Sequence, residues 1–588
     1  MSKSAKHLLD VIFLEKGHLL GLFLALLGSG LLQYYLLNVD LLSIWLLVSS
    51  AIIAAVGVLL SFRSIEVAKG NKNYAILTIC ITYFSLVIIP FVRFNSLSGN
   101  DMLFEFMAAQ NTLAHGWNTL SSLQSWYVGA SHLGYMSGLS ITVLPVMITK
   151  ITGLNMVFVF KFVLSGIIAT TPLLIYLTVK ETFRNSKLAV LSSIIFSEFY
   201  YSFQSISVQG ARQSIAILFV LFSLFVIAKL LNKNRCRSYF LLLPLFLFGI
   251  VFSHYTITYL SIVLFLSFTI ISTLLSKNKL IRNVFKVNFH EIPFTLHLLQ
   301  FVSAIFIVLS LIWFLAVPSS RLQIDLHNIM SLSQGRSLPA FDTVSTQYIS
   351  GSPLGPWIDY WLYFGVILII VGYLFLLFSK KDARISLFLI SGGMFFALIL
   401  ASFVIPNFWA IYGGFLRSYI TGYFVLCTFA AVALLAFDKK LRGLLLPAFL
   451  ILSLPMGLLL PANERYVLYH PEETVSPTVA IAQNYVTDSE FAASVWVKNY
   501  VPVGEQISTD YRGAVNMYYA NHPMLTVNPP TFPDYYYSSS YLYLTHFAVS
   551  YGLWLTPLTE QVDNIDVNSI IACNNIIYDD GNMVLSNR

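Results

Sequence analysis

The sequence is dominated by runs of about twenty apolar residues that recur along its first 461 positions. A hydrocarbon core about 30 Å thick is crossed by about 20 residues of α-helix at 1.5 Å per residue. Of the 588 residues, 57% are hydrophobic and only 10% are charged, against roughly 25% charged in an average soluble domain. Most of the chain therefore cannot face water, and the sequence predicts a polytopic α-helical membrane protein.

The apolar runs predict about thirteen transmembrane helices. The expected spans are 17–37, 41–61, 74–94, 154–179, 188–206, 210–231, 238–253, 255–275, 296–317, 357–379, 385–405, 413–437 and 441–461. The first run is longer than the core of a signal peptide and has no cleavage site of small residues, so we expect it to be retained as a helix.

Lysine and arginine cluster in short loops between the predicted helices. The clusters lie at 63–72, 180–187, 229–237, 277–286, 380–384 and 439–442. Short cytoplasmic loops carry an excess of these residues. With thirteen spans all clusters fall on one side, which predicts a multi-pass protein of the cell (plasma) membrane with a cytoplasmic N-terminus. A further span at 131–152 would put the later clusters on the opposite side of the membrane. We therefore expect this apolar stretch to be a helix on the outer surface, with Pro145 and Lys150 at the interface.

This topology divides the chain into two predicted domains. Residues 1–461 form a transmembrane bundle with outer loops at 95–153 and 318–356, and residues 462–588 form an extracytoplasmic domain. After Pro461 the apolar runs become short, and acidic residues, Tyr, Pro and Asn become more frequent. The outer side of the membrane is therefore where the chain has room for chemistry.

Within the C-terminal domain, local patterns predict four elements. They are a helix at 488–501 stopped by Pro502, a strand at 505–510, a short helix at 513–521 and a hairpin at 576–585 that turns on Asp-Gly. Strands that alternate with helices are typical of a small α/β domain.

The first outer loop contains two acidic residues, Asp101 and Glu105, in the segment GNDMLFEF (99–106). If this segment is helical, the four-residue spacing puts both carboxylates on one face. The alternative interpretation is that Asp101 only caps the helix and that Glu105 is solvated. The position of these acids at the predicted membrane surface favours a functional role.

Four ionisable side chains are expected near the outer ends of helices: Arg93, Arg212, His254 and Arg417. An ionisable residue inside an apolar span is costly and is therefore a candidate functional residue. Arginine suits phosphate because its planar guanidinium donates two parallel hydrogen bonds to phosphate oxygens. The alternative is an arginine that extends to the lipid headgroups, or a histidine satisfied within the bundle.

Several of these segments resemble the GT-C superfamily of integral-membrane glycosyltransferases. The matching segments are GNDMLFEF (99–106), QGARQS (209–214), FSHYT (252–256) and FAASVWVKNYVPVGEQISTD (491–510). By these motifs the chain is most similar to uncharacterised archaeal membrane proteins of that superfamily, and more distantly to oligosaccharyltransferases and protein O-mannosyltransferases. The resemblance also covers the architecture, with an acidic residue on the first large outer loop, a surface helix and a long bundle.

The resemblance implies a glycosyltransferase that moves a sugar from a polyprenyl-phosphate-linked donor to a cell-surface acceptor, which is a glycan, lipid or protein. It implies that Asp101 is the catalytic base or the acid that orients the acceptor, with Glu105 assisting it. It also implies that Arg212, His254, Arg417 and Arg93 bind the donor phosphate.

The chain departs from the oligosaccharyltransferase pattern at two motifs. Asn100-Asp101 replaces an Asp-x-Asp, and PDYYY (533–537) is the nearest string to a Trp-Trp-Asp-Tyr-Gly motif. This difference argues against peptide asparagine as the acceptor and leaves a requirement for a divalent cation such as Mg or Mn open.

Two other classes of function stay as alternatives: a transporter or flippase of lipid-linked saccharides, and a polysaccharide polymerase or ligase. Transporters commonly contain internal repeats, and none is evident in this sequence. A large C-terminal domain like the one predicted here is unusual for polysaccharide polymerases and ligases. Because the basic residues cluster in short loops between the apolar runs, no nucleic-acid partner is expected.

Overall fold

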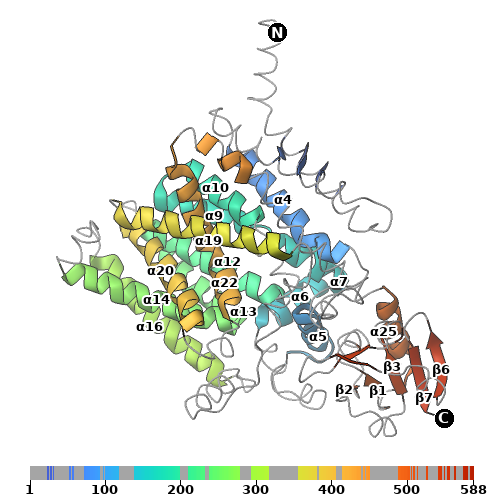
Figure 1. Cartoon of the computed structure of the whole chain (residues 1–588). Coiled ribbons are helices and arrows are strands. Elements are labelled where there is room, and N and C mark those ends of the chain that lie inside the picture. The colour runs from blue at the N-terminus through green and yellow to red at the C-terminus, as the bar shows by residue number, and fades with distance from the viewer. Residues whose placement is uncertain are drawn as a thin grey trace, which may run out of the picture.

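A computed structural model describes residues 72–92, 100–117, 138–198, 210–231, 238–278, 293–316, 355–379, 383–404, 414–438 and 488–502, with short segments elsewhere. In these residues a helical bundle precedes a smaller C-terminal part that contains the strands (Figure 1).

The bundle consists of helices at or near the predicted positions. They are α4 (Lys72–Val92), α5 (Asn100–His115), α6 (Leu139–Thr152), α7 (Met156–Phe158), the π-helix η4 (Val159–Leu164), α8 (Ser165–Ile168), α9 (Thr171–Phe183), α10 (Ser186–Glu198), α12 (Ala211–Leu230), α13 (Ser238–Ser253), α14 (Tyr255–Lys277), α16 (Pro293–Ala316), α19 (Gly355–Phe378), α20 (Ala383–Val404) and α22 (Gly414–Ala436). The predicted spans 17–37, 41–61 and 441–461 fall largely outside the described residues.

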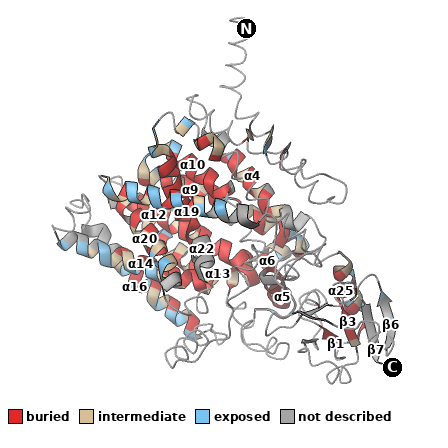
Figure 2. Ribbon diagram, in the orientation of Figure 1, coloured by how far each residue is buried: buried red, intermediate tan, exposed pale blue. Residues whose placement is uncertain are grey.

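Helix α12 lies at the centre of the bundle and is buried along nearly its whole length (Figure 2). It packs against α9 and α13, while α22 packs against α10, α19 and α20. By contrast, large apolar side chains such as Leu241, Leu315 and Phe378 are strongly exposed on α13, α16 and α19. A surface in contact with water rarely carries so many exposed apolar side chains, which is consistent with helices that face lipid.

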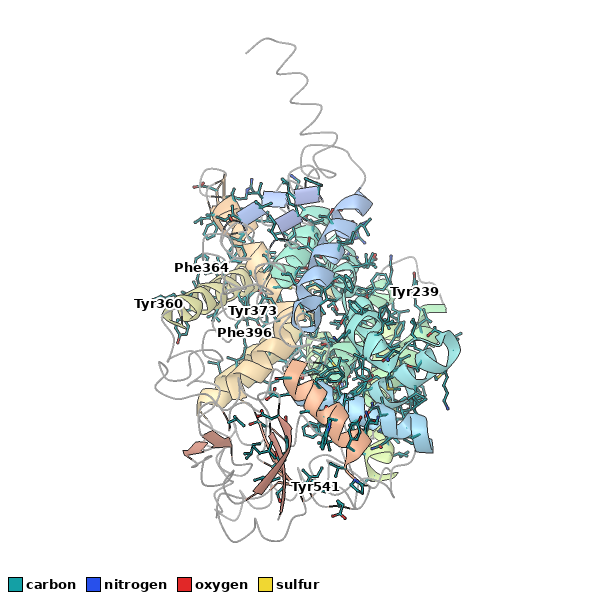
Figure 3. All side chains as sticks on the ribbon, turned by 90° about the vertical axis from the view of Figure 1, so that its right-hand side faces the viewer. Tyr239, Tyr360, Phe364, Tyr373, Phe396 and Tyr541 are labelled. Carbon is teal, nitrogen blue, oxygen red and sulfur yellow. The ribbon has the colours of Figure 1, made fainter. Side chains whose placement is uncertain are left out.

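Among the described residues, two continuous helical stretches, Met156–Phe183 and Ala211–Leu230, are long and apolar enough to cross a membrane. Length and composition alone are weak evidence, because a buried core helix of a soluble protein meets the same criteria. The exposed apolar side chains on α13, α16 and α19 are further evidence for helices that lie in a membrane. Tyr360 of α19 points outward, whereas Tyr373 of the same helix contacts Phe396 with ring centroids 5.0 Å apart (Figure 3).

The expected surface helix at 131–152 corresponds to α6, which packs against α5. It ends at Gly153, whose φ of 71° is in the left-handed region that favours glycine. Lys150 and Ile151 at the C-terminal end are exposed. Pro145 is buried within the protein, so its side chain packs against the bundle, and its position at the depth of the membrane interface stays a prediction.

In the described residues, the C-terminal part contains helix α25 and a mixed sheet. The elements are α25 (Asp488–Tyr500), β1 (Ile507–Thr509), β2 (Leu525–Val527), β3 (Tyr541–Leu544), β4 (Leu553–Leu555), β5 (Val562–Asn564), β6 (Asn574–Asp579) and β7 (Met583–Asn587). The sheet order is β2-β1-β3-β7-β6, with β1 parallel to β2 and β3, and β7 antiparallel to β3 and β6. Strands β4 and β5 form a separate antiparallel pair.

Helix α25 covers this sheet through Ala493 and Val497, which pack against Ile507 and Tyr543. The predicted helix at 488–501, the strand within 505–510 and the hairpin at 576–585 are therefore confirmed. Of the predicted helix at 513–521, only Gly513 is described, and the domain boundary at 461 lies outside the described residues. Phe491 of α25 packs against the core of the bundle, so the helix contacts both parts.

Helices α19 and α22 approach each other closely at Gly372. A Cβ atom on Gly372 would meet the backbone carbonyl of Phe429, so this crossing requires a residue without a side chain. We expect Gly372→Ala to lower the free energy of unfolding by roughly 1–3 kcal/mol through overpacking. The matched control is Gly443→Ala, where nothing lies within 4 Å of the added atom. Equal thermal midpoints for the two variants would contradict this account of the crossing.

Candidate active site

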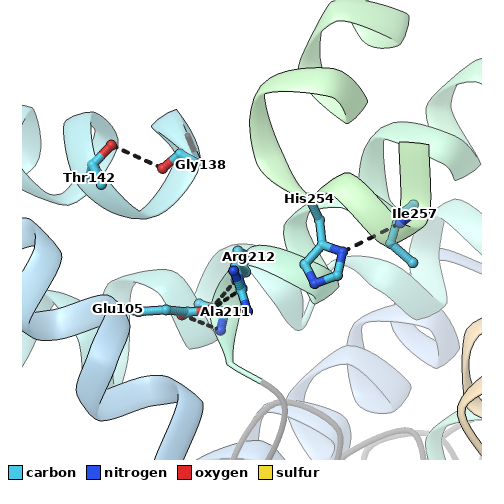
Figure 4. Close-up of polar contacts among 7 residues, drawn as sticks. All are labelled: Glu105, Gly138, Thr142, Ala211, Arg212, His254 and Ile257. Atoms are coloured by element: carbon cyan, nitrogen blue, oxygen red, sulfur yellow. Dashed lines mark hydrogen bonds and ion pairs between the residues drawn. The ribbon is translucent and has the colours of Figure 1, made fainter. Parts of the chain in front are cut away.

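The carboxylate of Glu105 is fully buried, and it connects α5 to α12. Its Oε2 accepts a hydrogen bond from the backbone N–H of Ala211 at 2.7 Å, and its Oε1 accepts one from the N–H of Arg212 at 3.3 Å (Figure 4). The first N–H groups of a helix have no partner within the helix, and this end carries a partial positive charge. Glu105 therefore caps α12 from a different part of the chain.

The residue before α12 must be glycine for two reasons. Gly210 has a φ of 82°, a conformation that residues with a side chain rarely adopt. A Cβ atom at this position would also collide with the carboxylate of Glu105. The glycine of QGARQS thus permits the close approach of Glu105 to the start of α12.

The Arg212 guanidinium is held between an acid and an aromatic ring. Its Nε lies 3.3 Å from Oε1 of Glu105, an ion pair in which both side chains are at most 5% exposed. The central carbon of the same guanidinium lies 5.6 Å from the centre of the Tyr255 ring, within the range of a cation–π contact. The positive charge is thus fixed in position beside the first turn of α12.

His254 precedes α14 and acts as its N-cap. Its Nδ1 accepts a hydrogen bond from the backbone N–H of Ile257 at 3.4 Å, and its ring stacks on that of Tyr255 with centroids 4.9 Å apart. An acceptor Nδ1 carries no proton, so the neutral imidazole has its proton on Nε2. His254 therefore presents a donor nitrogen on the edge of the ring opposite the cap, and both its ring and the guanidinium of Arg212 contact the ring of Tyr255.

The structure thus brings together three of the predicted site residues: Glu105, Arg212 and His254. Asp101 lies in the first turn of α5, one helical turn before Glu105, as the four-residue spacing predicts. Because α5 begins at Asn100, Asp101 lies within its first turn, and the interpretation of Asp101 as a helix cap stays an alternative. Glu105 is buried, so the alternative in which it is solvated is wrong.

The other two predicted phosphate ligands are less defined. Arg417 lies in the first turn of α22, and only its backbone is described. Arg93 directly follows α4 and falls outside the described residues. Their assignment to the donor phosphate stays a prediction.

Lys161, which is not among the residues predicted from the sequence, is buried in the π-helix η4. Its neighbour Phe160 packs edge-on against Phe106 of α5, with ring centroids 5.5 Å apart. Short π-helical segments within α-helices are frequent at functional sites. The signal that could have identified Lys161 is a lysine inside the apolar span 154–179.

A divalent cation would need a cluster of oxygen or nitrogen ligands. Within the described residues, no group of three or more His, Cys, Asp and Glu side chains is placed to hold a metal ion. Both oxygens of Glu105 already accept N–H groups, and the positive charge of Arg212 is adjacent. Glu105 is therefore unsuited to be a metal ligand.

No protein-family model and no curated protein sequence matches the chain. The structure is similar to that of ArnT from Cupriavidus metallidurans bound to undecaprenyl phosphate, with a TM-score of 0.50 and 11% identity, over 89% of this chain and 99% of that one. It is also similar to the archaeal oligosaccharyltransferase AglB from Archaeoglobus fulgidus in complex with an inhibitory peptide and a dolichol-phosphate, with a TM-score of 0.49 and 13% identity, over 81% and 70% of the two chains. The oligosaccharyltransferase of that organism in complex with Zn and sulfate gives a TM-score of 0.47 at 13% identity, over 80% and 68%.

ArnT is a glycosyltransferase of the GT-C class, and the likeness to it extends over almost its whole length. The chain therefore has the GT-C fold of integral-membrane glycosyltransferases, and the resemblance found in the sequence motifs is confirmed at the level of the fold. At this identity the likeness defines the fold and not the reaction.

We expect Glu105 and Arg212 to be strongly coupled energetically, because removing one member leaves a buried, uncompensated charge. Glu105→Gln and Arg212→Met should each destabilise the protein by roughly 3–5 kcal/mol, and the double variant should lose at least about 1 kcal/mol less than the sum. The measurement is a double-mutant cycle of reversible unfolding in mixed detergent micelles.

The control cycle uses Glu181→Gln and Lys229→Met. In that pair Nζ and Oε2 are 2.6 Å apart, but the lysine side chain is 31% exposed, so the expected coupling is only about 0.2–1 kcal/mol. Equal coupling in the two cycles would contradict the structural role assigned to the Glu105–Arg212 pair.

Proposed function

We propose that the protein is a glycosyltransferase that moves a sugar from a polyprenyl-phosphate-linked donor to a cell-surface acceptor on the outer face of the membrane. The observation that carries this proposal is the buried Glu105–Arg212 ion pair beside His254, one helical turn from Asp101. The GT-C fold, shared with a structure bound to undecaprenyl phosphate, supports the same class of reaction.

In the proposed reaction, a hydroxyl of the acceptor attacks the anomeric carbon of the donor sugar. The bond between that carbon and the phosphate oxygen breaks, and the electron pair leaves with the lipid phosphate. The new bond forms between the sugar and the acceptor oxygen, and the acceptor proton passes to Asp101 as general base. Atoms and charge balance without any further reactant.

Arg212, His254, Arg417 and Arg93 are proposed to bind the lipid phosphate, whose negative charge grows as it leaves. The guanidinium of Arg212 is already oriented by Glu105 and Tyr255, which reduces the entropy cost of binding. Glu105 assists by holding this arginine and by fixing α5 to α12. It is thus a positioning residue, whereas Asp101 is proposed to contact the acceptor.

A transporter or flippase of lipid-linked saccharides is the alternative from a different class. Substrate sites of many transporters lie at the bilayer midplane, in broken helices. Here the candidate charges lie at helix ends, at Arg212 in the first turn of α12 and at His254 between α13 and α14. This arrangement favours a site at one membrane surface, as the glycosyltransferase proposal requires.

We expect Asp101→Asn to abolish sugar transfer while leaving folding intact, because the amide keeps the shape of the side chain but cannot accept the acceptor proton. The measurement is transfer from radiolabelled polyprenyl-phosphate sugars in membranes that contain the wild-type or variant protein. Asp438→Asn, at the exposed end of α22, is the matched control and should retain activity. Unchanged transfer by Asp101→Asn would reject Asp101 as the base. No transfer by the wild type with any donor would favour the transporter alternative.

The two roles of His254 can be separated by two substitutions. Asparagine is a strong N-cap residue and alanine is a poor one, so His254→Ala should lose about 1 kcal/mol of stability and His254→Asn should lose little. Both variants should transfer sugar poorly if the imidazole contacts the donor phosphate. Wild-type transfer by His254→Asn together with impaired transfer by His254→Ala would show that His254 serves only as a cap.

A further inference from the structure

A cavity lies between α9, α12, α14 and α20, at the end of α12 remote from the candidate active site. It is lined by Thr178, Ala228, Phe268, Arg384 and Ser391 together with other, mainly apolar, side chains. Ala228 follows Arg212 by sixteen residues in the same helix, which corresponds to roughly 24 Å along the axis. The cavity is therefore separate from the Glu105–Arg212 cluster.

Four polar side chains that line this cavity are at least nine-tenths buried and can donate hydrogen bonds: Thr178, Thr182, Arg384 and Ser391. Arg384 is 7% exposed, and its Nη1 donates to the backbone carbonyl of Glu181 at 2.9 Å. The hydroxyl of Thr178 is buried and has no hydrogen-bond partner among the described residues. A buried hydroxyl without a partner is unfavourable, which indicates that a ligand or water accepts its hydrogen bond.

The charges around the cavity favour an anion. The side chain of Glu181 is engaged by Lys229, with Nζ 2.6 Å from Oε2, so the nearby carboxylate is already neutralised by a lysine. Arg384, whose guanidinium carries a positive charge, lines the cavity itself. At this end of the bundle, α9 also carries Lys180 in its last turn, and Arg184 follows directly.

The size of the cavity limits what can enter. It gives the centre of a water molecule about 20 Å³ of space, above the roughly 10–15 Å³ that one water requires. One oxygen atom of a phosphate group can therefore enter, while the rest of the group stays at the partly open mouth. A donor pair of arginine and hydroxyl is well suited to an anionic phosphate oxygen.

We infer that this cavity is a second binding site, for the phosphate group of an anionic membrane lipid or for free phosphate, with Arg384 and Thr178 as donors. Its basic surroundings belong to the loop clusters that the sequence places in the cytoplasm, where anionic lipid headgroups attract Lys and Arg. The inference does not depend on the proposed glycosyltransferase activity, because no group of the candidate active site takes part in it.

The test uses the full-length protein in detergent micelles and measures the thermal midpoint with increasing short-chain phosphatidylglycerol. Monoacylglycerol, which has no phosphate, serves as the lipid control, and inorganic phosphate is compared with chloride at equal ionic strength. We expect phosphatidylglycerol to raise the midpoint by several degrees through binding to the folded state. Monoacylglycerol should not do so.

The decisive variant is Thr178→Val, which removes the hydroxyl and keeps the shape. It should be at least as stable as the wild type without lipid, yet need roughly tenfold more phosphatidylglycerol for the same shift. Thr82→Val is the matched control, because the Thr82 hydroxyl in α4 is also buried without a partner among the described residues and lies outside the cavity lining. It should respond to lipid as the wild type does.

A second variant, Arg384→Met, should lose the lipid response more completely than Thr178→Val. If phosphatidylglycerol bound at any other surface, it would raise the thermal midpoint of Thr178→Val as much as that of the wild type. That result, or equal shifts by the two lipids, would overturn the inference and leave a buried water as the partner of Thr178. A shift with inorganic phosphate alone that Thr178→Val loses would support the site and identify free phosphate as its ligand.

Discussion

The contact between the Glu105 carboxylate and the first turn of α12 determines the arrangement of the whole candidate site. A carboxylate buried away from water is stable only if opposite charge and hydrogen-bond donors surround it. Here two backbone N–H groups and one guanidinium meet that requirement. The left-handed conformation of Gly210, the orientation of Arg212 and the attachment of α5 to the bundle all serve this one interaction, although the partners are more than one hundred residues apart in the chain.

Local patterns in the sequence were sufficient to predict most of the helices and part of the C-terminal sheet. Helix α13 spans the predicted residues 238–253, and the hairpin of β6 and β7 encloses the expected Asp-Gly turn. These features depend on hydropathy over one segment or on the chemistry of a two-residue turn. Pro145 shows the limit of such reasoning, because its burial depends on how α6 packs against other parts of the bundle.

The contacts within the candidate site were only partly predictable, because the side chains that contact one another come from separate helices. The cost of an ionisable residue in an apolar span identified Arg212 and His254 as candidates, and the position of Glu105 on the first outer loop identified the acid, but neither signal shows which partners these side chains have. The two signals could not show that Glu105 caps α12, that Tyr255 lies over Arg212, or that His254 caps α14. Lys161 was missed for a related reason, because its place in a π-helix depends on a local change of backbone that hydropathy does not detect.

The position of Glu105 also constrains how a donor phosphate could bind under the proposed function. A helix N-terminus is a ready site for a phosphate, and α12 would offer one if its first N–H groups were open. The carboxylate of Glu105 already accepts the N–H groups of Ala211 and Arg212, and a second anion there would be repelled. A donor phosphate therefore cannot use the N-terminus of α12, and it would have to engage the guanidinium of Arg212 away from Nε, which faces Glu105. The acid thus limits which edge of the guanidinium can receive the leaving group, in addition to holding the arginine in place.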